Sequence, residues 1–201
     1  MKKEIKQLKA LEKLTKGKEL RLAAEWRENW KVLISTILSA QTKDETTIDI
    51  SNILYKKYTS AKKLAAAPLK DIQKIIRPIN YYKTKSEHIK ETAKIISKTS
   101  IPKHLEGLME LPGVGRKVGN VYLAEAHKAD CIGVDTHVGR ISYKLGWSKS
   151  KNPYIIEKDL EKLFPRKYWR SINYIVVMFG RVHGKSRTKE DEILKRVKHL
   201  K

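Results

Sequence analysis

The residues with the clearest chemical potential lie in one short stretch, residues 111–117 (Leu-Pro-Gly-Val-Gly-Arg-Lys). Gly113 and Gly115 form a Gly-x-Gly turn, whose backbone N–H groups can approach a phosphate without interference from a Cβ atom. The partial positive charge at the start of the following helix adds to the attraction for an anion. Such a turn can hold a DNA backbone without reading the bases. Taken alone, it is explained equally well as a tight connection between two helices.

Lys117 comes directly after Arg116, in the first turn of the helix that follows this turn. The helix macrodipole and the neighbouring guanidinium both disfavour a protonated ammonium there. The position therefore suits a lysine that acts as an amine nucleophile. The chain holds 44 Lys and Arg residues, however, and without further context a lysine that contacts phosphate or solvent is the simpler interpretation.

Asp135 lies further along the chain, within residues 133–138 (Gly-Val-Asp-Thr-His-Val). It stands where a helix N-cap belongs, so its side chain is expected to accept a backbone hydrogen bond. A carboxylate in such a place can also stabilise a developing positive charge or transfer a proton. The spacing alone favours the capping role.

The composition favours a polyanionic partner. Lys and Arg number 44 against 22 Asp and Glu, which gives a formal net charge of +22 at pH 7. Such a charge suits nucleic acid or an anionic membrane surface, and an acidic protein is a further alternative. The single cysteine, Cys131, excludes an intramolecular disulfide and a four-cysteine metal site. No run approaches about twenty apolar residues and the first residues lack an apolar stretch, so we expect a cytoplasmic protein that does not span a membrane.

Apolar residues recur at three- and four-residue steps along most of the chain, and strand-like alternation is nearly absent. We therefore expect an all-α fold of about ten helices. Asp44 is expected to cap the helix that follows it, and Gly180 to end the helix that begins near Trp169. Residues 112–115 form a turn between two helices. Residues 190–192 (Glu-Asp-Glu) are interpreted as the acidic first turn of a short terminal helix.

Three segments together resemble the endonuclease III family of the helix-hairpin-helix (HhH-GPD) DNA glycosylases. They are residues 111–117, residues 134–138 (Val-Asp-Thr-His-Val) and residues 38–44 (Leu-Ser-Ala-Gln-Thr-Lys-Asp). The resemblance runs from about Trp26 to Arg181. It implies an all-α, two-lobed helix-hairpin-helix DNA glycosylase fold that holds DNA at the mouth of a cleft between the lobes.

On this resemblance, residues 21–129 are expected to form a six-helix lobe that contains the hairpin. Residues 1–20 and 130–201 are expected to form the second helical lobe, without an iron-sulfur cluster. The family removes oxidised pyrimidines in base excision repair and then cleaves the abasic strand by β-elimination. Lys117 matches its Schiff-base lysine, which attacks the sugar C1′, and Asp135 matches its catalytic aspartate.

The resemblance also implies which residues contact DNA. The hairpin that grips the phosphate backbone, together with the residue that follows it, corresponds to Pro112, Gly113, Val114, Gly115 and Arg116.

Gln41 and Tyr81 fall in the two loops that, in the family, fill the gap left when the damaged nucleotide is flipped out. Tyr81 stands where many relatives carry Leu. An aromatic ring there can stack on the orphan base, and a tyrosine packed within its loop is an equally good interpretation. His137 is expected to reach a phosphate, although a histidine on a helix surface is the simpler interpretation.

The end of the chain departs from the family pattern. Most members carry four cysteines there that hold an iron-sulfur cluster, whereas residues 182–188 (Val-His-Gly-Lys-Ser-Arg-Thr) contain none. We therefore expect no cofactor and no metal. His127, Cys131 and His137 do not form a recognised zinc spacing, and Cys131 is expected in the core. The basic tail from Lys185 is expected either to contact DNA or to close its lobe in place of the cluster.

Two residues separate the chain from other relatives. Thr36 stands where adenine-removing relatives carry Glu, and Lys117 stands where thymine-mismatch relatives carry Tyr.

Two alternatives remain open: an 8-oxoguanine DNA glycosylase/AP lyase of the archaeal type, and a non-catalytic helix-hairpin-helix DNA-binding module. The presence of both Lys117 and Asp135 favours an enzyme. The expected partner is double-stranded DNA with damaged bases or abasic sites, bound by a monomer at the nucleoid of a prokaryote.

Overall fold

The three- and four-residue spacing of apolar side chains produces helices throughout the chain. The computed structural model describes residues 2–18 and 20–200, and in these residues it contains helices and no strand. This confirms the all-α prediction. None of the described helices combines the length and apolar character needed to cross a membrane.

The helices of the described residues follow one another as α1 (Lys3–Thr15), α2 (Asn29–Ser39), α3 (Asp44–Lys57), α4 (Ala61–Ala66), α5 (Leu69–Ile75), α6 (Tyr82–Ile96), α7 (Leu105–Met109), α8 (Arg116–His127), α9 (Thr136–Leu145), α10 (Pro153–Leu163), the 3₁₀ helix η1 (Arg166–Tyr168), α11 (Trp169–His183) and α12 (Arg187–Lys198).

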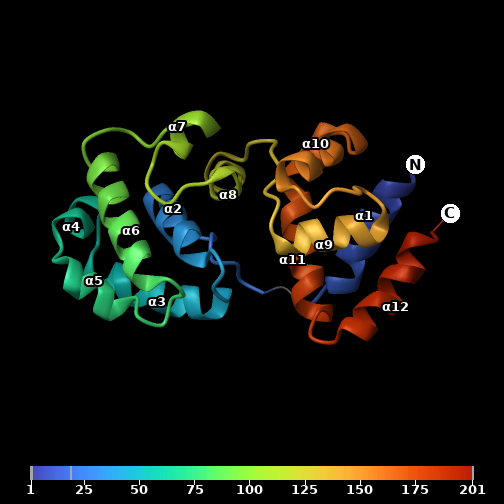
Figure 1. Ribbon diagram of the computed structural model, residues 1–201, viewed down its shortest axis with the longest axis horizontal. Helices are drawn as coiled ribbons and strands as arrows, with labels where there is room; N and C mark the ends of the chain where they lie inside the picture. Colours follow the sequence, from blue (N-terminus) through green and yellow to red (C-terminus); the bar gives the residue numbers. More distant parts are fainter. Residues whose placement is uncertain (1, 19, 201) are drawn as a thin grey trace. The chain divides into compact units, whose positions relative to one another are not determined.

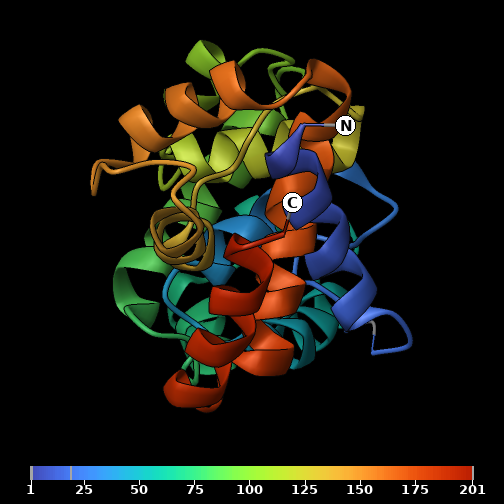
Figure 2. The same ribbon diagram turned by 90° about the vertical axis from the view of Figure 1, so that its right-hand side faces the viewer.

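The chain divides into two compact units (Figure 1). The middle unit is Arg21–Lys128 and holds α2 to α8, seven helices where six were expected. The terminal unit combines Met1–Leu20 with Ala129–Lys201, so the first and last helices belong to the same unit. Figure 2 shows α1, α11 and α12 side by side, in agreement with the contacts among these three helices.

Helix α2 is central to the middle unit. It packs against α3, α6 and α8, and residues 32–38 are all buried. A helix that is apolar on all sides must be enclosed by others. The hydroxyl groups of Ser35 and Thr36 donate to the carbonyls of Lys31 and Val32, each at 2.6 Å, so these buried polar atoms are satisfied within the helix itself.

The terminal unit is built around α11, which packs against α1 and α9. Its core joins apolar side chains from the two ends of the chain, including Leu8, Ile141 and Leu194. Gln7 of α1 adds polar links: its Oε1 accepts a 2.7 Å hydrogen bond from the Trp147 indole, and its Nε2 donates to the Lys198 carbonyl at 3.2 Å. The last helix is therefore part of the packed unit.

Two predicted helix boundaries are wrong. Lys43 is the N-cap of α3, and Asp44 is the first helical residue, where its charge complements the macrodipole. Gly180 does not end α11, which continues to His183 with Gly184 as its C-cap. Gly180 is buried against another side chain, so its lack of a Cβ serves helix packing and not helix termination.

Two other predicted placements also need correction. Cys131 is half-buried and does not belong to the core, whereas its neighbour Ile132 is fully buried there. Glu190 does lie in the first turn of the terminal helix, but its side chain is fully buried. That helix begins at Arg187, and Ser186 caps it by accepting from the backbone N–H of Lys189 at 3.4 Å.

Candidate active site

The glycine turn before α8 is held firmly against α6. Gly113 has a φ of 77°, a left-handed conformation that favours glycine. A Cβ on Gly113 would lie 2.9 Å from Nδ1 of His88, so the close approach also requires glycine. The Thr92 hydroxyl donates to the Pro112 carbonyl at 2.8 Å. The turn is therefore a fixed platform on the middle unit.

Helix α8 starts directly behind this platform. Its N-cap is Gly115, which is exposed and has no side chain of its own to cap the helix. The first amides of a helix have no partner within the helix, so this end presents N–H groups and a positive dipole to an anion. Lys117 is the second residue of α8 and is half-buried. A Cβ on Gly119 would lie 2.6 Å from Cδ1 of Leu105, which shows how closely α7 packs beneath this end.

The two loops that carry Gln41 and Tyr81 are joined to each other. The backbone N–H of Asn80 donates to the Thr42 hydroxyl at 3.2 Å, and the Asn80 side-chain amide donates to the Gln41 carbonyl. Gln41 and Tyr81 both adopt left-handed backbone conformations, with φ of 55° and 59°. Tyr81 is 67% exposed, so its ring is not packed within its loop. The structure thus brings these two predicted residues into one loop pair.

Asp135 is the N-cap of α9 in the terminal unit. Its Oδ1 accepts a hydrogen bond from the backbone N–H of Val138 at 2.8 Å, as the sequence predicted. The segment before it is anchored because Asn173 of α11 donates to the Gly133 carbonyl at 2.6 Å. The bond from Val138 orients the carboxylate, and Asp135 is half-buried, so its side chain still reaches the surface.

His137 lies in the first turn of α9 and is half-buried. Burial lowers the pKa of its imidazole, and the charges of Arg140 and Arg181 lower it further, although Asp135 opposes them. The Arg140 guanidinium, which can only donate, lies 3.1 Å from Nδ1. Nδ1 is therefore the acceptor, and the neutral ring carries its proton on Nε2. In this arrangement His137 can donate a hydrogen bond to a phosphate through Nε2.

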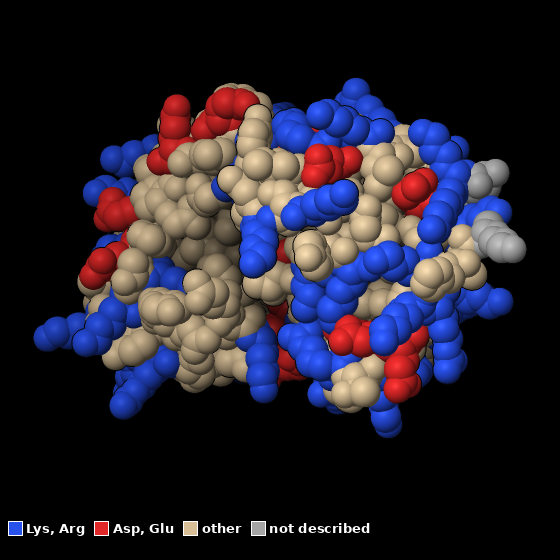
Figure 3. Space-filling model, turned by 45° about the vertical axis from the view of Figure 1, so that its right-hand side comes forward, with Lys and Arg blue, Asp and Glu red and all other residues tan. Residues whose placement is uncertain are grey.

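These predicted residues divide between the two units. Gln41, Tyr81 and the turn with Lys117 belong to Arg21–Lys128, whereas Asp135 and His137 belong to the terminal unit. Lys and Arg side chains are spread widely over the face drawn in Figure 3, with smaller groups of Asp and Glu between them. This surface agrees with the net charge of +22.

A family model described as HhH-GPD superfamily base excision DNA repair protein matches residues 34–166. The chain belongs to this family. Endonuclease III from Thermotoga maritima is 41% identical over 155 residues, which cover 76% of this chain and 73% of that protein. Endonuclease III from Synechocystis sp. is 35% identical over 155 residues, covering 75% and 71%.

A solved structure, "Structure of a Trapped Endonuclease III-DNA Covalent Intermediate: Estranged-Adenine Complex", matches with a TM-score of 0.84 and 30% identity. The match covers 93% of this chain and 90% of that one. Within the HhH-GPD family the chain is therefore of the endonuclease III type, a DNA glycosylase and AP lyase of base excision repair.

The residues of this endonuclease III-type chain do not fit a four-cysteine cluster. The sequence has one cysteine. Among residues 2–18 and 20–200, no group of three or more His, Cys, Asp or Glu side chains is placed to hold a metal ion. We therefore assign no step to a cluster or metal.

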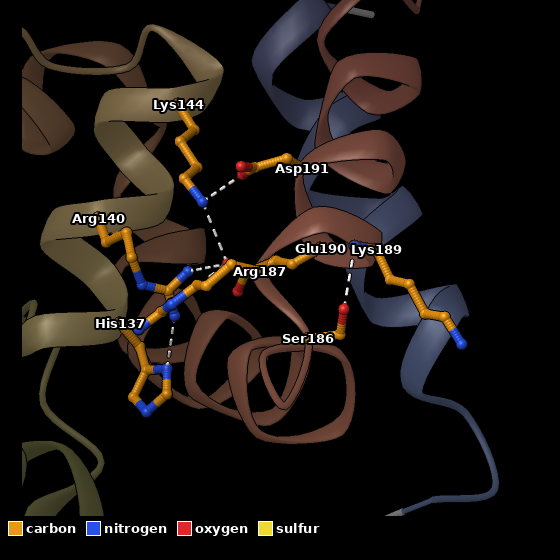
Figure 4. Close-up of polar contacts among 8 residues, drawn as sticks. All are labelled: His137, Arg140, Lys144, Ser186, Arg187, Lys189, Glu190 and Asp191. Carbon is orange, nitrogen blue, oxygen red and sulfur yellow. Dashed lines mark hydrogen bonds and ion pairs between the residues drawn. The ribbon is translucent and has the colours of Figure 1, made fainter.

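Glu190, which the sequence did not single out as a site residue, ties α12 to α9 (Figure 4). Its Oε2 accepts from Arg140, from Lys144 at 3.2 Å and from Arg187 at 3.3 Å. Burial of Glu190 raises its pKa, but hydrogen bonds and charges from Arg140 and Lys144 outweigh burial and hold the pKa below its ordinary value. The same Arg140 contacts His137, so α12 supports the first turn of α9.

Lys85 is a second important residue that the sequence interpretation missed. It is buried on α6, and its ammonium lies at the end of α2, next to the Gln41 loop. A signal for both missed residues was present in the helical spacing. Lys85 falls in step with Ile89, and Glu190 in step with Leu194, so each charge occupies a position in an apolar stripe. A charge at such a position predicts a buried and paired group.

Proposed function

We propose that this chain removes oxidised pyrimidines from double-stranded DNA and cleaves the abasic strand, with Lys117 as its nucleophile. The Lys117 Nζ forms a bond to C1′ while the bond from C1′ to the base breaks, and the base leaves with a proton. Opening of the sugar ring turns the adduct into an imine. Loss of a proton from C2′ then expels the 3′ phosphate by β-elimination.

The observation that carries this proposal is the position of Lys117. It is the second residue of α8, directly after a turn in which Gly113 adopts a left-handed conformation and Thr92 binds the Pro112 carbonyl. An amine on a fixed helix end can be aimed at a sugar whose phosphates rest on the neighbouring N–H groups. A surface lysine on a mobile segment could not be aimed in this way.

Asp135 has two proposed roles. Its carboxylate caps α9, and it stabilises the positive charge that develops at the sugar and assists the attack. The capping bond from Val138 fixes the orientation of the side chain, which favours a preorganised charge.

DNA binding is proposed to use both units. Backbone groups of Pro112, Gly113, Val114 and Gly115, together with the Arg116 side chain, contact phosphates. His137 donates to a further phosphate through Nε2. Gln41 and Tyr81 enter the gap that the flipped nucleotide leaves.

The enzyme is proposed to act without an iron-sulfur cluster, as a monomer associated with the nucleoid in the cytoplasm of a prokaryote. Its two lobes are proposed to be residues 21–129 and residues 1–20 with 130–201, and the division of the chain into Arg21–Lys128 and Met1–Leu20 with Ala129–Lys201 supports this. Helix α12 closes the terminal lobe, because Leu194 and Val197 lie in its core. Iron analysis of the purified protein and truncation after Arg181 test these points: we expect no iron, and loss of folding or DNA affinity on truncation.

Borohydride trapping tests the nucleophile. The protein is incubated with a duplex that contains one abasic site, and borohydride reduces any imine to a stable covalent bond. We expect a protein–DNA band with the wild type and none with Lys117→Ala or Lys117→Arg. The arginine variant is the matched control, since it keeps the charge for DNA binding and cannot form the imine.

The absence of a band in a wild type that binds DNA would contradict the lyase assignment. It would favour a monofunctional glycosylase or a binding module. A panel of duplexes with oxidised pyrimidines and 8-oxoguanine then tests the lesion class, and faster release of 8-oxoguanine would overturn the pyrimidine proposal.

A further inference from the structure

Lys85 makes a complete set of hydrogen bonds at the end of α2. Its side chain is 7% exposed. The Nζ donates to the carbonyls of Leu38 at 2.7 Å and Ala40 at 2.5 Å, and to the Thr42 hydroxyl at 3.3 Å. An ammonium has three hydrogens, so all three are used.

These contacts set the path of the chain after α2. The last carbonyls of a helix have no partner within the helix, and they attract a cation. Lys85 binds two carbonyls, one on each side of the helix end. It also binds Thr42, the residue that follows Gln41. Gln41 lies between two of the contacts, in its left-handed conformation.

The same contacts reach the second loop. The Thr42 hydroxyl accepts from the Asn80 backbone N–H at 3.2 Å, while Asn80 also donates to the Gln41 carbonyl. Asn80 precedes Tyr81, and Tyr81 is the N-cap of α6, the helix that carries Lys85. One connected set of hydrogen bonds therefore runs from Lys85 through Thr42 to Asn80, which bonds to Gln41 and directly precedes Tyr81.

The backbone at Gln41 and Tyr81 is costly to maintain. A left-handed conformation is unfavourable for residues with a side chain and persists where surrounding contacts enforce it. Lys85, Thr42 and Asn80 supply such contacts.

We propose that Lys85 is a positioning residue that holds the Gln41 and Tyr81 loops in the shape that enters DNA when a nucleotide is flipped out. The inference rests on the proposed function of these two loops. In this role Lys85 itself touches neither DNA nor the reacting sugar. Its effect is expected only where the enzyme must open a paired duplex.

Lys85 could also affect activity through its charge, by acting on Lys117. The test must distinguish this effect from an effect on the loops. Burial, together with the charge of Lys117, lowers the pKa of Lys85 to about 8. If Lys85 acted mainly on the charge of Lys117, its removal would change the reaction on every abasic substrate. If it acts through the loops, a substrate that needs no flipping is spared.

The test compares Lys85→Met with Lys90→Met, a matched control on the same helix. The Lys90 Nζ donates to the Ala67 carbonyl at the end of α4, at 2.6 Å, so it makes the same kind of contact away from the loops. Single-turnover rates are measured on a paired lesion in duplex DNA and on an abasic site in single-stranded DNA. A fluorescent base beside the lesion reports unstacking when the protein binds.

We expect Lys85→Met to lose roughly tenfold to a hundredfold in rate on the paired lesion, the scale of a small misplacement of an active-site group. The fluorescence rise should fall with it. The rate on single-stranded abasic DNA should stay close to that of the wild type. Lys90→Met should retain both rates. Equal losses of Lys85→Met on the two substrates, or no loss on the duplex, would overturn the inference.

A second variant keeps the test valid if Lys85→Met does not fold. Thr42→Val removes the hydroxyl that joins Lys85 to Asn80 and leaves the charge of Lys85 in place. The same duplex-specific loss is expected. Borohydride trapping of the wild type on abasic DNA is run alongside, because its failure would reject the proposed lyase, whereas a trapped wild type with unaffected variants would reject only the role of Lys85.

Discussion

Gly180 of α11 lies directly against the ring of His137 on α9: a Cβ on Gly180 would come within 2.1 Å of Nδ1. That nitrogen also lies 3.1 Å from the Arg140 guanidinium. The first turn of α9, which Asp135 caps, therefore depends on a position without a side chain inside a neighbouring helix.

Gly180→Ala should destabilise the protein, because the His137 ring has to move and its contact with Arg140 is lost. Overpacking of this kind costs about 1–3 kcal/mol, and an approach as close as 2.1 Å belongs at the upper end, above the roughly 1 kcal/mol that alanine gains over glycine within a helix. Gly139→Ala in α9 is the control, since its Cβ would meet only Ile156, at 3.6 Å. Denaturant unfolding measures both, and equal effects of the two variants would contradict the packing argument.

Substitutions of Asp135 should separate its two roles. Asparagine caps helices about as well as aspartate, so Asp135→Asn should keep the free energy of unfolding and lose the charge. We expect its base-release rate to fall on the order of a hundredfold. Asp135→Ala should lose the same activity and also about 1 kcal/mol of stability. Full activity of the asparagine variant would leave Asp135 as a cap alone.

Tyr81 should show a conflict between stability and function. Tyr81→Gly relieves a left-handed conformation that costs about 1 kcal/mol or more, and the exposed ring leaves little packing to lose. Thermal unfolding should therefore show equal or higher stability, while excision from paired duplex DNA falls. Tyr81→Asn is a useful comparison, since asparagine tolerates this conformation and also lacks the ring. Unchanged excision by both variants would remove Tyr81 from the DNA interface.

Glu190→Gln should destabilise the terminal unit by on the order of 2 kcal/mol, because Arg140 and Lys144 lose a buried anion. Asp191→Asn is the control: it also pairs with Lys144, but its side chain is 46% exposed, so the loss should be small.

The same variant should differ from the wild type in its pH dependence. The pKa of Glu190 is lower in the folded protein than the value of about 4.3 expected for the unfolded chain. Its ionised form therefore contributes stability that is fully present above about pH 4.3 and is lost as the pH falls through the folded-state pKa. The difference in unfolding free energy between wild type and Glu190→Gln should shrink as the solution is acidified below about pH 4.3. A constant difference would contradict a pKa lowered by ion pairing.

The errors in the sequence predictions share a cause. The sequence pattern singles out Gly180 and Glu190, but it describes each only within its own helix. It indicates a helix end at Gly180 and a complement to the helix dipole at Glu190. In the structure each serves a contact with α9. Local rules describe one helix at a time, and a glycine or a carboxylate has the same local preferences whether or not a second helix lies against it.

The sequence by itself determined the helical fold, the glycine turn before Lys117, the capping role of Asp135 and the family. These depend on helical periodicity, on backbone preferences of single residues and on short motifs, all of which are local. Only the tertiary structure decided that Lys85 of α6 binds the carbonyls at the end of α2. The same holds for the bond from Asn80 that joins the Gln41 and Tyr81 loops, and for the ion pairs of Glu190 that link α12 to α9. A hydrogen bond or ion pair between distant residues forms only when packing brings them within about 3 Å, and no spacing in the sequence encodes that distance.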